Sequence, residues 1–154
     1  MKARIALAVL AALVVPVALH AQMKMQMLTE KEQVTALQKA IANGKKHFND
    51  PKLGGATTGA SCNSCHPGGG TSGGSVTVMG MRMAIPDVRS SAATFPKWKM
   101  GAQRVITLGE MNNGCIEMFM KGKALRLDDP KYAELAAYET SLAQGKALYP
   151  QLPK

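Results

Sequence analysis

The sequence Cys62-Asn63-Ser64-Cys65-His66 is a Cys-x-x-Cys-His motif, and its residue types and spacing suit a specific chemistry. Two thiols three residues apart on a single turn can both add to the vinyl groups of one haem, and the adjacent imidazole then reaches the iron from the same side. A redox-active or disulfide-bonded cysteine pair is the alternative, and a zinc site would need two further ligands that are not evident. The motif predicts one covalent haem c, attached through Cys62 and Cys65, with His66 as an iron ligand.

The second axial ligand decides what such a haem can do, because the identity of the axial ligand shifts the reduction potential strongly. His47 lies beside two lysines, and we expect it to be a solvated surface residue. A single methionine is more often a core residue than a ligand. The methionines that lie far enough beyond His66 to fold back over a haem are Met100, Met111, Met118 and Met120.

Cys115 is the third cysteine of the chain and lies outside the haem motif. An inert buried thiol or an intermolecular disulfide is one interpretation. The residue falls in the middle of a predicted helix, with Met111 and Met118 on the same face. A thiol on an inward face near iron would deprotonate, ligate the metal and lower the potential, because thiolate donation stabilises ferric iron. Cys115 is therefore a candidate iron ligand beside the methionines.

The length and composition indicate one small folded domain. The chain has 154 residues, of which 46% are hydrophobic, and this apolar fraction excludes a wholly disordered protein. Aromatic residues make up only 5%, whereas methionine occurs eleven times, so methionine must fill space that phenylalanine fills elsewhere. The net charge of +9 does not by itself indicate nucleic-acid binding, because no arginine-rich run or aromatic stacking platform accompanies it.

The N-terminal segment is typical of an export signal. Lys2 and Arg4 form a basic start, and the apolar stretch Ile5–Leu19 has the length of a signal-peptide core. We expect residues 1–21 to be a signal peptide cleaved after its last residue; an uncleaved N-terminal anchor is the alternative. Residues 22–28 are expected to be a mobile mature N-terminus. Removing the leader reduces the charge from +9 to +7, and the mature protein would enter an oxidising compartment, the periplasm.

The remaining residues, 29–154, are predicted to be an all-α domain of three main helices separated by long loops. Capping-box and proline signals place the helices at 30–48, from Thr107 to about Lys121, and from Asp129 to about Gly145. No strand pair is expected, and residues 76–100 are taken as irregular. The apolar residues at helical spacing are Val34, Leu37, Ile41 and Phe48 in the first helix, and Leu135, Tyr138 and Leu142 in the third.

Loops this long are unusual in a small domain unless something else fills its interior. A covalent haem would supply that interior, and the glycine-rich stretch 67–75 would let the backbone pass close to the porphyrin edge. The first and last helices, which carry Gly44, Phe48 and Tyr138, would cross and pack together. This arrangement resembles the class I cytochrome c fold.

A narrower resemblance covers roughly residues 40–145. The chain resembles one haem domain of the thiosulfate dehydrogenases and of the A-type subunit of the sulfur-oxidation (Sox) cytochromes. The resemblance implies that Cys115 ligates the haem iron and, in a catalytic domain, lies where thiosulfate or a sulfur adduct binds. The segments that carry it are Gly44–Asp50, Phe95-Pro96-Lys97-Trp98, Ile106–Glu110, Asn112–Leu125, Asp129-Pro130 and Tyr138.

The chain also departs from that family pattern. Typical members carry two haem domains, whereas this sequence has one Cys-x-x-Cys-His motif. Glu117 stands two positions after Cys115, where the family usually has an arginine, and Glu110-Met111 replaces a basic residue. A glutamate facing the iron would repel an anionic substrate. Compensating positive charge could come from Lys99, Arg104, Lys121, Lys123 and Arg126.

Three functions follow as hypotheses. The first is a periplasmic monohaem cytochrome that transfers electrons, with sulfur-compound oxidation as its pathway. The second is the catalytic haem subunit of a thiosulfate dehydrogenase or Sox-type enzyme, with Cys115 at the active site. The third is a haem-based redox or ligand sensor. For the first, the basic charge favours another redox protein with an acidic docking surface, or a second cytochrome subunit, as the partner. No nucleic-acid partner and no stable membrane span are expected.

Overall fold

The computed structural model describes residues 28–148, which form parts of two units, residues 1–34 and 35–154. The predicted leader, residues 1–21, lies outside the described residues, as does all but the last residue of the predicted mobile segment 22–28. None of the helices within residues 28–148 is long and apolar enough to cross a membrane.

Three main helices are present, as the sequence predicts. They are α2 (Glu30–Phe48), α5 (Leu108–Met118) and α6 (Pro130–Leu142), and α5 ends three residues earlier than expected. Short helical turns connect them: η1 (Leu53–Gly55), α3 (Cys62–Cys65), α4 (Val88–Ser91), η2 (Ala92–Thr94) and η3 (Met100–Ala102).

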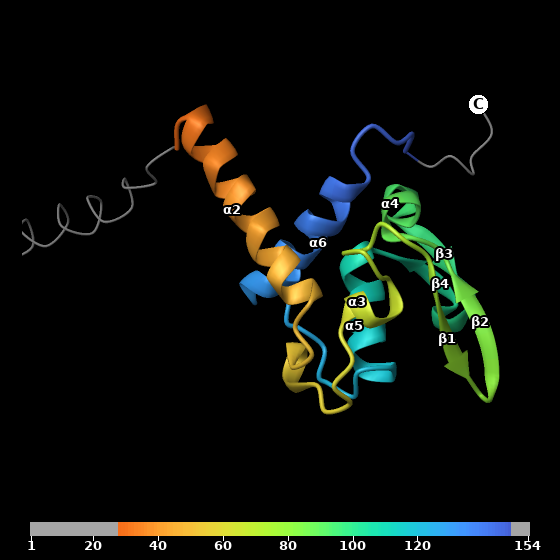
Figure 1. Ribbon diagram of the computed structural model, residues 1–154. Coiled ribbons are helices and arrows are strands. Elements are labelled where there is room, and N and C mark those ends of the chain that lie inside the picture. Colours follow the sequence, from red (N-terminus) through yellow and green to blue (C-terminus); the bar gives the residue numbers. More distant parts are fainter. Residues whose placement is uncertain (1–27, 149–154) are drawn as a thin grey trace, which may run out of the picture. The chain divides into compact units, whose positions relative to one another are not determined.

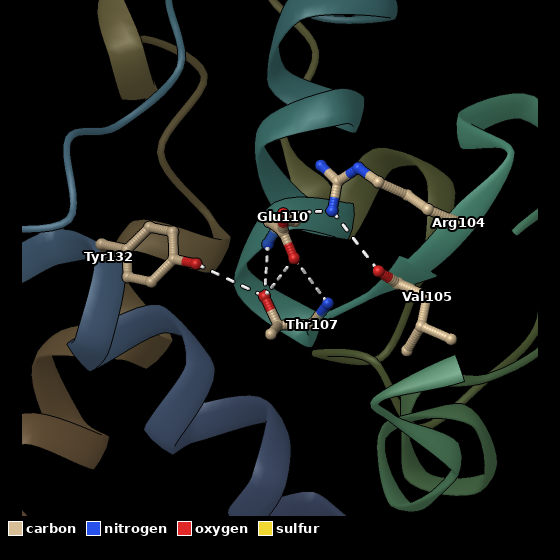
Figure 2. Close-up of polar contacts among 5 residues, drawn as sticks. All are labelled: Arg104, Val105, Thr107, Glu110 and Tyr132. Carbon is tan, nitrogen blue, oxygen red and sulfur yellow. Dashed lines mark hydrogen bonds and ion pairs between the residues drawn. The ribbon is translucent and has the colours of Figure 1, made fainter. Parts of the chain in front are cut away.

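Each main helix begins with the cap that its sequence predicts. At α2 the Thr29 amide donates a 2.8 Å hydrogen bond to Glu32 Oε2. At α5 the Thr107 amide donates to Glu110 Oε2 at 2.7 Å, and the Glu110 amide donates to Thr107 Oγ1 at 3.2 Å (Figure 2). The Asp129 carboxylate accepts from an amide in the first turn of α6. These bonds satisfy amides that a helix start leaves without partners.

The predicted crossing of the first and last helices is confirmed. A Cβ built at Gly44 would overlap the backbone carbonyl of Glu134 and lie 2.7 Å from Tyr138 Cβ, so only glycine permits this approach of α2 to α6. Next to the crossing, the Phe48 and Tyr138 rings meet edge to face with their centroids 5.4 Å apart. The crossing therefore joins two segments distant in sequence through the core.

The apolar face predicted for the first helix is only partly buried. Phe48 is buried and Ile41 packs against the core, but Val34 and Leu37 are 50% and 56% exposed. The fully buried large side chains among the described residues are few, namely Phe48, Leu53, Ile116 and Leu135. Such a small core is consistent with the expectation that a bound group supplies part of the interior.

Two antiparallel hairpins are present, so the expectation of no strand pair was wrong. Strands β1 (Gly74–Val78) and β2 (Met81–Ile85) pair across Met79 and Gly80, both of which have positive φ angles of 49° and 78°. This is the backbone of a two-residue hairpin turn, but its sequence lacks the Asn-Gly or Asp-Gly signal that would have predicted it.

The second hairpin pairs β3 (Lys97–Lys99) with β4 (Arg104–Ile106), and β4 leads directly into α5 (Figure 1). Its strands are only three residues long, too short for alternation of polar and apolar residues to be recognised in the sequence. The Arg104 side chain extends toward the first turn of α5, and its Nη1 lies 2.7 Å from Glu110 Oε1 (Figure 2).

Candidate haem site

The two cysteines of the haem motif lie at the ends of the single helical turn α3. The Ser61 amide donates to Ser64 Oγ at 3.0 Å, and the His66 amide donates to the Cys62 carbonyl at 2.8 Å, which closes the turn. Both thiols are free and half-buried. The turn thus presents two thiols from one short segment, as attachment to a single porphyrin requires.

The imidazole of His66 is held by the backbone of a distant loop. His66 Nδ1 lies 3.0 Å from the Pro86 carbonyl oxygen. A carbonyl can only accept, so Nδ1 carries the proton and Nε2 keeps a free lone pair, the arrangement found in metal-binding histidines. Burial lowers the pKa of His66 and favours the neutral ring. No local sequence pattern predicts this contact, because Pro86 acts through its backbone carbonyl.

The glycine-rich loop after the motif is closely packed. The Gly69 amide donates to Asn63 Oδ1 at 2.8 Å, and the Gly69 carbonyl accepts a 2.7 Å hydrogen bond from the Tyr138 hydroxyl. A Cβ at Gly74 would overlap the Cys65 carbonyl. These contacts tie the haem motif to α6 and to the start of β1.

An open hollow of about 550 Å³ lies on the β1–β2 hairpin. Its lining residues are Gly74, Ser75, Arg82 and Ala84. Gly74, which lines this hollow, also lies against the Cys65 carbonyl, but the haem-motif side chains do not line it. The two thiols on one turn and the free imidazole nitrogen are what fit the requirements of haem c.

The fold brings Cys115 close to the haem motif. Burial, together with the charges of Glu139 and Cys65, raises the pKa of the Cys115 thiol to about 11. Burial, together with the charges of Glu139 and Cys115, likewise raises the pKa of Cys62 to about 12. Cys115 therefore lies within electrostatic reach of Cys62, Cys65 and Glu139.

The neighbours of Cys115 hold α5 in register. The Asn113 side chain accepts from the Leu125 amide at 2.8 Å and donates to the Leu125 carbonyl at 2.9 Å. This pair of bonds fixes the loop after α5 against the helix that carries Cys115. The "Asn-Asn" sequence before Cys115 therefore has a structural role that the motif alone does not reveal.

The methionine candidates occupy different environments. Met100 lies in η3 and is 78% exposed, and Met118 at the end of α5 is also exposed. Met120 is buried in the core cluster. Met111 is half-buried, one helical turn before Cys115. Of the four methionines, Met111 is the one that lies on α5 and is half-buried, as Cys115 is.

His47 is not the solvated surface residue that the sequence suggested. Its Nε2 lies 2.8 Å from Glu134 Oε2, and both side chains are largely covered, with 18% and 20% of their surfaces exposed. Asn43 Nδ2 donates to the other oxygen of the same carboxylate at 2.8 Å. His47 therefore links α2 to α6.

Glu139 is the residue that the sequence analysis missed. It is 3% exposed, and the Asn112 amide nitrogen donates to its Oε2 at 2.7 Å. Burial raises the pKa of this carboxyl to about 8. A sequence signal did exist: Glu139 is four residues after Leu135 and three before Leu142, so helical spacing places it on the buried face of α6.

Comparisons with known proteins agree with this geometry. The sequence model of the family described as "SoxA/TsdA, cytochrome c domain" matches residues 43–148. The thiosulfate dehydrogenase of Allochromatium vinosum is 29% identical over 119 residues, which cover 71% of this chain and 40% of that protein. A solved structure of thiosulfate dehydrogenase (TsdBA) from Marichromatium purpuratum superposes with a TM-score of 0.61 at 19% identity, covering 74% of this chain and 24% of that one.

These matches confirm the predicted cytochrome c-like fold and the resemblance on which the sequence analysis relied. The chain spans well under half the length of the thiosulfate dehydrogenases that it matches. The match to the family model covers most of the described residues and includes the cysteine turn, α5 and α6. The chain therefore belongs to the SoxA/TsdA cytochrome c domain family, whose cofactor is haem c.

Proposed function

We propose that this protein is an exported monohaem c-type cytochrome that transfers electrons in the oxidation of thiosulfate or related sulfur compounds. The observation that carries the proposal is the pairing of a two-thiol turn with an imidazole whose Nδ1 is held by the Pro86 carbonyl. Membership of a family that includes thiosulfate-oxidising proteins supports the pathway. The signal-like residues 1–21 support export to the periplasm.

In this proposal Cys62 and Cys65 attach the haem and His66 Nε2 binds its iron. The haem supplies a one-electron redox centre. The chain orients the imidazole through Pro86, closes the cysteine turn through Ser61, and packs the glycine-rich loop and α6 around it. These contacts would restrain the imidazole and the cysteine turn around such a haem.

Cys115 is our proposed second axial ligand. The mutual electrostatic influence of Cys115 and the haem-motif cysteines supports this assignment, and the half-buried Met111 is the alternative on the same helix. Burial favours the protonated thiol in the bare protein, whereas a coordinated metal ion deprotonates a thiol outright. Thiolate ligation would give a low reduction potential.

Electron paramagnetic resonance of the oxidised holoprotein tests this ligand. Wild type should give a low-spin signal of thiolate character, and Cys115→Ala should lose it. Met111→Leu is the matched variant on the same helix and should leave the signal unchanged. A near-infrared thioether band in wild type that disappears in Met111→Leu would contradict the assignment to Cys115.

The proposed partner is another redox protein with an acidic docking surface, or a second cytochrome subunit. The net charge, +9 for the full chain and +7 without the proposed leader, supports this, because an opposite charge accelerates the encounter of redox proteins. The association rate with an acidic partner should fall steeply as salt is added, as stopped-flow mixing would measure.

A second candidate function is the catalytic haem subunit of a thiosulfate-oxidising enzyme. It is favoured by the exposed position of Glu117, since that carboxylate then does not repel an anion at Cys115. Mixing the holoprotein with thiosulfate and an electron acceptor tests this function. Reduction of the haem supports catalysis, and a haem that stays oxidised excludes catalysis by the isolated chain.

The sensor hypothesis requires an iron ligand that a small molecule can displace. A ferrous spectrum that carbon monoxide leaves unchanged would count against it.

A further inference from the structure

The methionines of this chain are concentrated in two short runs of the same pattern. Met79, Met81 and Met83 occupy alternate positions in the β1–β2 hairpin (Figure 1). A second Met-x-Met-x-Met run, residues 23–27, lies outside the described part of the chain. Each run holds three methionines, so together they account for six of the eleven in the sequence. The proposed haem function uses none of these six.

Met81 and Met83 lie on the same face of β2. Successive side chains of a strand point to opposite faces, so residues two positions apart share a face. Arg82, between them, points the other way, and its Nε donates a 2.9 Å hydrogen bond to Ser75 Oγ. Arg82 is also the single charged residue in the sequence of the hairpin, residues 74–85. The methionine face of the hairpin therefore carries no charged side chain.

Two valines of β1 lie opposite the methionines of β2. In the antiparallel register Val76 pairs with Met83, and Val78 pairs with Met81. The Cβ atoms of residues paired in this way are about 4.5 to 5.5 Å apart, so their side chains contact one another. Both valines are half-buried, whereas Met81 and Met83 are 63% and 50% exposed. The two thioethers thus have an apolar base on one side and are open to solvent on the other.

Met79 adds a third thioether at the adjoining turn. It is 92% exposed, and its φ of 49° is a left-handed conformation that asparagine, aspartate and glycine adopt more readily than methionine. A Cβ built at Gly80, the other turn residue, meets nothing within 4 Å, so the turn lies in open space. Packing therefore does not explain a methionine at this position. Residues held in such unfavourable conformations are typical of functional sites.

Thioethers are soft, uncharged ligands, and metal ions differ in their preference for them. Soft sulfur ligands select Cu(I), whereas Mg²⁺ and Ca²⁺ take oxygen ligands. The sequence of the hairpin, residues 74–85, contains no histidine, cysteine, aspartate or glutamate that would favour another ion. Alternate residues of a strand are about 7 Å apart along the backbone. Methionine has three rotatable bonds in its side chain, so two such residues can direct their sulfur atoms to one ion.

We propose that the thioethers of Met79, Met81 and Met83 bind a Cu(I) ion on the exposed face of the β1–β2 hairpin. The site uses none of the haem-motif residues and does not depend on the function proposed for them. Neutral ligands leave the complex with the single charge of the ion. An apolar base such as Val76 and Val78 tolerates a single charge better than the double charge of a divalent ion. Binding involves no change in the oxidation state of the copper.

Equilibrium dialysis of the holoprotein against buffered Cu(I), without oxygen, tests the site. The haem is reduced beforehand so that it does not oxidise the copper, and copper and iron per chain are measured by mass spectrometry. Met81→Leu should weaken binding at least about tenfold, because even the loss of an outer contact to a metal ligand costs that much. The double variant Met81→Leu/Met83→Leu should bind one equivalent of copper fewer than wild type. Met100→Leu removes an exposed methionine outside the hairpin and should bind copper as wild type does.

X-ray absorption at the copper edge identifies the ligands in the same samples. Wild type should show sulfur neighbours at about 2.3 Å, the usual length of a metal–sulfur bond. Equal copper in wild type and the double variant would overturn the proposal, as would nitrogen or oxygen neighbours in place of sulfur. Cys115→Ala should retain the full amount of copper, and a loss confined to that variant would assign the ion to the thiol instead. The iron content reports the haem separately, so failure of the copper site and failure of the proposed function are distinguishable.

Discussion

Replacing Glu139 by glutamine should remove a large pH dependence of stability. Glu139 is 3% exposed, and its single described hydrogen bond is the one that Asn112 donates. Burial raises the pKa of the carboxyl to about 8, so the folded protein holds it in the neutral form at pH 7. Glutamine keeps the shape and the acceptor oxygen for Asn112 but cannot ionise. The substitution therefore isolates the cost of a buried negative charge.

The sign of the effect follows from the two pKa values. The unfolded carboxyl titrates near 4.5 and the folded one near 8, so the folded state binds this proton more tightly. Its contribution to stability is complete below about pH 4.5 and is lost as the pH rises through about 8. At 1.36 kcal/mol per pKa unit, the full loss is about 4 to 5 kcal/mol. Wild type should lose up to this much free energy of unfolding, relative to Glu139→Gln, between about pH 5 and pH 9.

Guanidinium denaturation of the haem-loaded protein, followed by circular dichroism across this pH range, measures the difference. Glu117→Gln makes the same chemical change at an exposed site and should run parallel to wild type. The other titrating groups are common to all three proteins, so their effects cancel in the difference between the curves. Parallel curves for wild type and Glu139→Gln would refute the conclusion that burial controls this carboxyl.

Two further predictions concern the frame around the site. Gly44→Ala should lower the free energy of unfolding by about 1 to 3 kcal/mol or more, because the added Cβ would overlap the Glu134 carbonyl. Gly101→Ala places a Cβ in open space and should have little effect. Equal stabilities of the two variants in thermal denaturation would contradict the tight crossing. Thr107→Ala should lower the free energy of unfolding by about 1 kcal/mol, because it removes the hydroxyl that accepts from the Glu110 amide. An unchanged melting temperature would show that this cap contributes nothing to stability.

The helices were predictable because their signals are local. The threonine caps at Thr29 and Thr107 and the proline at the start of α6 each act within one turn of chain. The Cys-x-x-Cys-His motif is local in the same sense. The crossing at Gly44 was also predicted, from Gly44, Phe48 and Tyr138 on the first and last helices.

The features that the sequence analysis missed depend on contacts between distant segments. The Pro86 carbonyl orients His66 through the backbone, so its residue type carries no signal. His47 was expected in solvent because two lysines adjoin it, but α6 supplies Glu134 as its partner. The hairpins are short, and the Met79 turn does not have the usual turn residues.

The charge distribution at the site was the least predictable feature. The sequence offered five basic residues as compensating charge for Cys115. In the fold, Arg104 pairs with Glu110 and Arg126 pairs with Asp128, which no local pattern predicts. Burial of Glu139 depends likewise on which face of α6 the core covers.

The intact mass of the exported protein, measured with its visible absorbance, tests the central claim most directly. Produced in a host with the machinery for cytochrome c maturation, the chain should carry the mass of one added haem through denaturation and show a Soret band. A variant with both Cys62 and Cys65 replaced by serine should lack the added mass. A wild-type product with the mass of the polypeptide alone and no Soret absorbance would contradict the account.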